Sequence, residues 1–292
     1  MRKKKTITRR SLLRSVGVGT MASMGLAHPW ASTGFAQSRK INGNIKQSAC
    51  QWCYRDIKLE DLAAGAARIG LKSVELIGPE ELPIVKQHGL TCAITWGCGP
   101  IQDCLNRREN HDRCEADLRK NIEFAAAEGI PNVICFSGNR GGMSDDEGLE
   151  NCVIGIKRAV GYAEKMGVTI CIEGLNSKVN HIDYMADNTA WCVELIKQVG
   201  SPRFKLLYDI YHMQIMEGDV IRTIRENHEY IAHYHTGGVP GRHEIDDTQE
   251  LNYPAIIRAI LDTGYTGFLG QEYIPTRDPL ESLSQGFQIC DV

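Results

Sequence analysis

The chain has 292 residues, of which 42% are apolar and 24% charged, a composition typical of a globular enzyme with one large α/β domain or two small ones. No run of about 18 or more apolar residues occurs, so the sequence predicts no membrane-spanning helix. The formal net charge is −3, but the first 36 residues carry seven basic residues and no acidic one, which leaves −10 on the remainder. An acidic body argues against nucleic acid as a partner.

The first 36 residues differ in composition from the rest of the chain. A strongly basic start is followed by a modestly apolar stretch rich in glycine, alanine and serine. This composition predicts a bacterial export signal that takes no part in the fold. Residues 8–14 (TRRSLLR) resemble the twin-arginine signal, which routes already folded proteins into the periplasm. A basic amphipathic first helix is the alternative, but the glycines of this stretch disfavour it. We therefore expect a signal at 1–36, cleaved or disordered, and one folded domain at 37–292.

The remainder repeats one pattern, a short apolar run followed by a loop and an amphipathic stretch. The apolar runs predict strands at 45–53, 72–77, 90–95, 132–137, 168–173, 205–209, 230–235 and 267–272. The amphipathic stretches predict helices at 58–69, 80–88, 111–128, 146–166, 188–199, 218–227, 253–263 and 277–288. Glycines such as Gly70 and Gly129 follow these stretches, as left-handed helix caps do. Eight such units predict a single-domain (β/α)₈ TIM barrel. An open doubly wound sheet is the alternative, but no glycine-rich phosphate loop follows the first strand.

The last four predicted strands share one feature at their carboxyl ends. In a barrel, alternate residues point inward and the active site lies at these ends. Each of the four strands finishes with an inward side chain that can bind a metal, namely Glu173, Asp209, His235 and Glu272. Three carboxylates brought together repel one another unless a cation neutralises them. Three oxygen donors and one imidazole favour Mn²⁺ or Mg²⁺ as that cation. The alternative is four unrelated polar residues bonded to loop backbone.

Five segments carry a resemblance to a known family. They are 172–176 (IEGLN), 208–219 (YDIYHMQIMEGD), 233–242 (HYHTGGVPGR), 250–253 (ELNY) and 267–273 (GFLGQEY). These segments resemble the hydroxypyruvate isomerase family of the xylose isomerase-like TIM barrels, which also include ketose 3-epimerases. The resemblance covers most of residues 45–292, and its most specific parts are YDIYHMQ and GQEY.

The resemblance implies roles for particular residues. The family's metal ligands correspond to the four strand-end residues, and Glu173 and Glu272 also correspond to its acid/base pair. His212 corresponds to a substrate-binding histidine and Arg242 to a substrate-binding arginine. His181, in the loop after the fifth strand, is a weaker candidate for contact with substrate. Two weaker candidates lie on earlier strands, Glu75 near the end of the second and Trp96 as an apolar wall past the third.

The family's chemistry is isomerisation of a small molecule. The resemblance implies a metal-dependent isomerase that interconverts a small hydroxy-carbonyl compound through an enediolate, as an aldose–ketose isomerase does. Either glutamate could be the first base. A ketose 3-epimerase on the same site is one alternative, and a non-catalytic exported sugar-binding barrel is another. A DNA-repair endonuclease is disfavoured by the acidic body and by the lack of histidines at the third strand. Whether the chain forms a homo-oligomer is left open.

Eleven cysteines are scattered through the chain without the spacing of a disulfide scaffold. Several stand in apolar runs, where cysteine acts as a small buried hydrophobe. Residues 50–53 form a CxxC motif, but a redox pair of the thioredoxin type would begin a helix rather than end a strand. A disulfide among Cys98, Cys104 and Cys114, formed after export, stays open.

Overall fold

The computed structural model describes residues 41–292 of the chain, and all the elements named below lie in this unit. The predicted export signal at 1–36 lies outside the described residues. Within 41–292, no helix has both the length and the apolar character that crossing a membrane requires.

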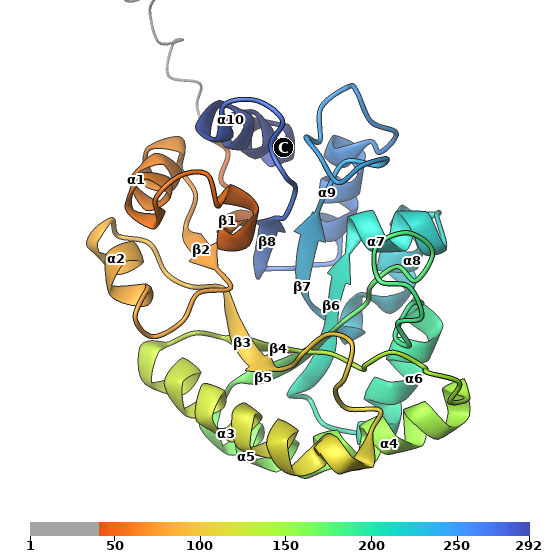
Figure 1. Ribbon diagram of the computed structural model, residues 1–292. Coiled ribbons are helices and arrows are strands. Elements are labelled where there is room, and N and C mark those ends of the chain that lie inside the picture. Colours follow the sequence, from red (N-terminus) through yellow and green to blue (C-terminus); the bar gives the residue numbers. More distant parts are fainter. Residues whose placement is uncertain (1–40) are drawn as a thin grey trace, which may run out of the picture. The chain divides into compact units, whose positions relative to one another are not determined.

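Eight parallel strands form the centre of this unit (Figure 1). They are β1 (Lys46–Cys50), β2 (Ser73–Glu75), β3 (Ile94–Cys98), β4 (Asn132–Cys135), β5 (Thr169–Glu173), β6 (Phe204–Asp209), β7 (Ile231–Thr236) and β8 (Phe268–Gln271). Their order is β2-β1-β8-β7-β6-β5-β4-β3. A parallel bridge between Ser73 and Thr91, and a 2.9 Å hydrogen bond from Leu76 N–H to Ile94 O, nearly close the ring between β2 and β3. The prediction of a single-domain TIM barrel is confirmed.

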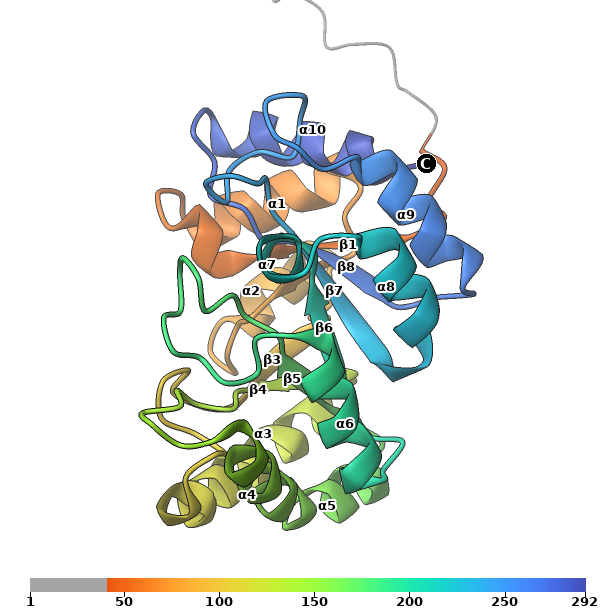
Figure 2. The same cartoon turned by 90° about the vertical axis from the view of Figure 1, so that its right-hand side faces the viewer.

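Helices alternate with the strands and lie outside them (Figure 2). They are α1 (Leu59–Ile69), α2 (Leu82–Gln87), α3 (His111–Glu128), α4 (Asp145–Lys157), α5 (Val160–Met166), α6 (Thr189–Val199), α7 (Ile210–Met216), α8 (Val220–Asn227), α9 (Tyr253–Asp262) and α10 (Pro279–Cys290). Three short 3₁₀ helices are η1 (Gln51–Tyr54), η2 (Arg108–Asn110) and η3 (His228–Tyr230). Gly70 and Gly129 have φ of 116° and 70°, so both form the left-handed caps that the sequence predicts.

Four elements differ from the sequence prediction. The first strand was predicted at 45–53, but β1 ends at Cys50 and Gln51–Tyr54 form the 3₁₀ helix η1. The third strand was predicted at 90–95 but spans Ile94–Cys98, because the apolar run starts before the part that pairs with β4. The helix predicted at 146–166 is two helices, α4 and α5, and the backbone between them is tightened by i→i−3 hydrogen bonds from Arg158 and Ala159. Helix α7 was not predicted. It begins directly after Asp209, whose side chain caps it by accepting a 3.2 Å hydrogen bond from the backbone N–H of His212.

Candidate active site

The four predicted strand-end residues lie together at the carboxyl ends of the strands. Glu173 ends β5, Asp209 ends β6, His235 is the last residue but one of β7, and Glu272 follows β8. Asp209 is opposite His235 in the β6–β7 register. One donor atom from each of the four lies within 4.8 Å of the others, and all four residues are buried. The sequence therefore places the four side chains correctly, while their role as metal ligands stays a prediction.

The His235 ring has a different partner on each side. Its Nε2 lies 2.9 Å from Oε1 of Glu75 within hydrogen-bonding geometry, whereas its Nδ1 lies 3.3 Å from Oε1 of Glu173 and 3.0 Å from Oε2 of Glu272. Within residues 41–292, neither His235 Nδ1 nor Glu173 Oε1 has a partner with hydrogen-bonding geometry. If Nε2–H donates to Glu75, the Nδ1 lone pair faces two carboxylates. That arrangement is repulsive unless a proton or a cation lies between them.

Glu75 is the residue that sequence analysis underestimated. It is fully buried at the end of β2 and also contacts Nε2 of His233 at 3.2 Å and Sγ of Cys50 at 3.1 Å. Burial raises the pKa of Glu75, but His233 and His235 lower it more, so the pKa lies below its ordinary value. One sign of this buried contact in the sequence is Gly270, an inward-facing glycine in the segment GFLGQE. A Cβ at this position would lie 2.2 Å from Oε1 of Glu75. The missing side chain on β8 leaves the space in which the Glu75 carboxylate and the His235 ring meet.

Arg242 also lies at this cluster. In the loop after β7 its φ is 59°, and its Nη2 lies 2.5 Å from Oε2 of Glu272 and 3.4 Å from Oδ2 of Asp209. Its guanidinium carbon is 5.0 Å from the ring centre of Trp52, and the Trp52 Nε1–H donates a 2.8 Å hydrogen bond to Oε1 of Glu272. The residue predicted to bind substrate therefore contacts two of the predicted metal ligands, where it offsets their charge.

The environment of the carboxylates separates their acidities. Burial raises the pKa of Glu173, and the negative charge of Glu272 raises it further. Burial also raises the pKa of Asp209 well above its ordinary value, although the positive charge of Arg242 opposes this. Burial acts on Glu272 in the same direction, but Arg242 and His235 outweigh it and hold the pKa of Glu272 well below its ordinary value. Glu272 is therefore the carboxylate with the strongest cationic compensation.

His212 lies beside Asp209 in the first turn of α7 and is fully buried. Its Nδ1 accepts a 3.1 Å hydrogen bond from the backbone N–H of Asn176, which places the ring proton on Nε2. That nitrogen is 3.6 Å from Oδ2 of Asp209 and has no hydrogen-bond partner in the described part of the chain. Burial and the charge of Arg242 lower the pKa of His212, so the ring is neutral and Nε2–H is available as a donor. The rings of His181 and His212 meet edge-on, with their centres 5.3 Å apart.

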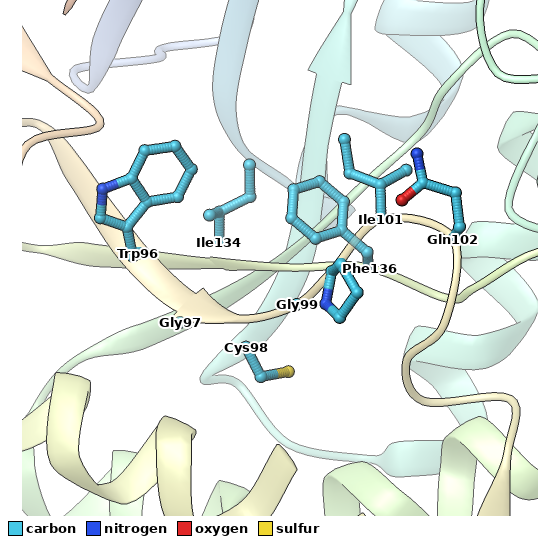
Figure 3. A pocket seen from close by; sticks show the side chains of 9 residues that line it. Trp96, Gly97, Cys98, Gly99, Ile101, Gln102, Ile134 and Phe136 are labelled. Carbon is cyan, nitrogen blue, oxygen red and sulfur yellow. The ribbon is translucent and has the colours of Figure 1, made fainter. Parts of the chain in front are cut away.

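A cavity of about 300 Å³ opens in front of this cluster. Its lining consists of Trp52, Arg55, Leu76, Trp96, Ile101, Ile134, Phe136, Glu173, Leu175, His181, Arg242 and Glu272. A second hollow of about 360 Å³ shares Trp96, Ile101, Ile134 and Phe136 with it and is shown in Figure 3. The cavity therefore has a charged end at the glutamates and an apolar end, where Trp96 forms the wall that the sequence predicts.

Comparison with known proteins places this barrel among its relatives. Residues 64–290 match the model of the family described as Xylose isomerase-like TIM barrel. The chain belongs to this family. The match spans all the elements that carry the candidate site except β1 and η1.

The curated relatives include proteins named as isomerases. A 2-oxo-tetronate isomerase of Cupriavidus necator is 30% identical over 246 residues, which cover 76% of this chain and 89% of that protein. The hydroxypyruvate isomerase of Escherichia coli is 29% identical over 227 residues, which cover 72% of this chain and 85% of that protein. The chain spans only 62% of the length of the human and mouse relatives that it matches.

Solved structures of the same fold are more distant in sequence. A protein from Brucella melitensis, titled AP endonuclease, family 2, has a TM-score of 0.74 at 24% identity and covers 82% of this chain and 98% of that one. A D-psicose 3-epimerase from Clostridium cellulolyticum H10 has a TM-score of 0.67 at 17% identity and covers 85% of this chain and 97% of that one. At these identities the likeness shows the TIM-barrel fold and not its chemistry.

Proposed function

We propose that the chain is a metal-dependent isomerase that interconverts a small hydroxy-carbonyl compound, with Glu173 and Glu272 as its acid/base pair. The observation that carries the proposal is the approach of both glutamates to His235 Nδ1, at 3.3 and 3.0 Å, at the charged end of the cavity. The two bacterial relatives named as isomerases, each aligned over more than 70% of this chain, support the same chemistry.

The donor set is suitable for a divalent cation. Glu173, Asp209, His235 and Glu272 would hold it, because their donor atoms converge and Nδ1 of His235 and Oε1 of Glu173 have no hydrogen-bond partner within residues 41–292. Three oxygen donors and one imidazole favour Mn²⁺ or Mg²⁺. When bound, such a cation supplies positive charge that stabilises negative charge developing on substrate oxygens.

The chain's own residues account for the proton transfers. Moving a carbonyl to the neighbouring carbon requires that a proton be removed beside it and a proton be returned, which two carboxylates can share. Glu173 and Glu272 both line the cavity, and Glu272 is held in place by the Trp52 Nε1–H and by Arg242. The Nε2–H of His212 has no hydrogen-bond partner within residues 41–292, and we expect it to donate to a substrate oxygen once substrate is bound. We also expect the apolar lining of the cavity to limit water at the reacting carbon.

The test is turnover in D₂O. Small ketoses and hydroxy-oxo acids are screened with Mn²⁺, and recovered substrate and product are analysed for deuterium. We expect deuterium on a carbon flanking the carbonyl, with the carbonyl moved to the neighbouring carbon. A 3-epimerase would instead leave the carbonyl in place and invert the next centre, so the same experiment distinguishes the two chemistries.

Substitution of the two carboxylates then tests the roles of the residues. Glu272→Gln keeps the side-chain shape and should lose about 10²–10⁴ in rate, as the loss of general acid/base function commonly does. Metal content is measured beside activity, because Glu272 is also a proposed ligand. Glu217→Gln, at a carboxylate that instead binds the start of α6 through Thr189, is the matched control. An active Glu173→Gln, Glu272→Gln double variant would refute the proposal.

A further inference from the structure

Three cysteines lie together away from the candidate active site. Cys98 ends β3, Cys104 lies in the loop that follows, and Cys114 is in the first turn of α3. All three are buried, with at most 4% of each residue exposed. Figure 3 shows the Cys98 sulfur pointing away from the Trp96 and Phe136 rings, toward the helices outside the barrel. Cys98 also lines the second hollow, so the cluster lies at the back of the apolar end of the cavity.

The sulfur positions form a compact triangle. Sγ of Cys104 is 3.7 Å from Sγ of Cys98 and 3.6 Å from Sγ of Cys114, and all three sulfurs lie within 4.8 Å of one another. A point equidistant from the three lies roughly 2.1–2.4 Å from each, which brackets the ~2.3 Å zinc–thiolate bond. Three sulfurs from a strand end, a loop and a helix thus lie at roughly the separations that thiolates bound to one metal ion adopt.

The donors also define the class of ion. Thiolates are soft ligands and select Cu⁺ or Zn²⁺, whereas the oxygen-rich set at Glu173 and Glu272 suits harder cations. Within residues 41–292, the three-cysteine group includes no fourth histidine, cysteine or carboxylate. Structural zinc sites take four protein ligands, so a set of three favours Cu⁺, or Zn²⁺ with one open position.

We propose that Cys98, Cys104 and Cys114 form a second metal site, for a thiophilic d¹⁰ cation of the Cu⁺ and Zn²⁺ class. Each thiol that binds the cation gives up its proton to solvent, so that a metal–sulfur bond replaces a sulfur–hydrogen bond. A bound cation would tie β3, the following loop and α3 together. Residues 99–102 of that loop line the apolar hollow, so the second site supports one wall of the cavity.

The experiment uses the full chain, reduced and freed of metal, titrated separately with Cu⁺ and with Cd²⁺ as a spectroscopic substitute for Zn²⁺. We expect one equivalent of either ion to produce an ultraviolet thiolate-to-metal charge-transfer band. Asp209→Asn should retain this band, since oxygen and nitrogen ligands do not produce it. Cys104→Ser should lose the band and one bound equivalent, and Cys98→Ser provides a second variant should Cys104→Ser fail to fold. If Cu⁺ and Cd²⁺ give different stoichiometries, the ion that binds one per chain is the one selected.

The matched control is Cys290→Ser, at a fully buried cysteine of α10 outside the group, which should bind as the parent chain does. An equal band in Cys104→Ser, or no band in the parent chain, would overturn the proposal. A disulfide would overturn it as well, because protein isolated without reductant would then titrate nine free thiols rather than the eleven of the sequence. That bond requires Sγ of Cys104 to move from 3.6 Å to ~2.05 Å from its partner.

Discussion

The mouth of the barrel has two unlike halves. The ends of β5 to β8 bring together three carboxylates, an imidazole and a guanidinium, whereas β3, β4 and their loops contribute Trp96, Ile134 and Phe136. Burial makes each charge in the first half costly unless another charge lies beside it. The second half carries no such cost and keeps water away, which strengthens every charge interaction across the cavity. The candidate reacting groups therefore lie in the half in which each buried charge is stabilised by the charges beside it.

The largest effect on stability is expected from substitution of Arg242, the side chain whose positive charge compensates the carboxylates of the charged half. Removing one partner of a buried ion pair costs about 3–5 kcal/mol, because the other charge is left uncompensated. Arg242→Gln should therefore lower the free energy of unfolding by about 3 kcal/mol in metal-free protein, and by much less with Mn²⁺ bound. Denaturant unfolding with and without Mn²⁺ measures both values. Arg277→Gln, at a side chain that is 43% exposed, should cost less than about 1 kcal/mol in either state.

Equal losses for Arg242→Gln in the two states would show that arginine and metal do not neutralise the same carboxylates. The two halves of the cavity would then differ in packing, and not in charge that arginine and metal both compensate.

The next effect concerns the proposed ligands themselves. His235→Ala removes the imidazole at the centre of the cluster, and Asp209→Asn removes a carboxylate charge. Each should weaken Mn²⁺ binding by more than the ~100-fold that loss of an outer hydrogen-bond partner can cost. Calorimetric titration gives the affinities. A His235→Ala chain that binds Mn²⁺ as the parent does would exclude this cluster as the site.

Several strands and site residues could be predicted from the sequence, whereas others depend on tertiary contacts that the sequence alone does not reveal. The apolar runs that end in Glu173, Asp209 and His235 predict the strands and their functional ends, because alternate side chains of a strand point to the same face. The position of β3 was displaced because the apolar run around Cys92 continues past the point where pairing with β4 begins. Helix α7 was missed because it is seven residues long and starts directly after Asp209, the last residue of β6, with no intervening loop.

Contacts across the barrel are harder to predict than strand ends. Glu75 lies 160 positions from His235 in the chain, and only the closing of the barrel brings β2 opposite β7. The cysteine group has the same origin, since the spacing of Cys98, Cys104 and Cys114 matches no metal motif and their convergence depends on how α3 packs behind β3. Arg242 was identified by resemblance, but its contact with Glu272 follows from a left-handed backbone that sequence did not indicate.

A smaller effect is expected for Glu75, the buried partner that orients His235. Glu75→Gln keeps the shape but changes the acceptor into an amide, so the His235 ring loses its charged partner. Mn²⁺ affinity should fall ~10–100-fold, the usual cost of losing such a partner, with the fold retained. Competition with a metal-binding dye gives the ratio, and Glu217→Gln controls for loss of a carboxylate elsewhere. A variant with unchanged affinity would show that His235 is oriented by strand β7 alone.

The smallest effect is expected in the apolar half. Trp96 is 43% exposed at the cavity wall and touches none of the charged groups through a hydrogen bond within residues 41–292. Trp96→Ala removes apolar surface that a bound substrate would cover, so it should raise KM several-fold, about 1 kcal/mol of binding. It should leave kcat within about twofold, because the bound substrate and the transition state lose the same interaction. Trp96→Phe should restore most of the loss. If kcat falls instead while KM is unchanged, the apolar wall also fixes the geometry of the charged half, and the two halves act as one unit rather than as a reacting half and a binding half.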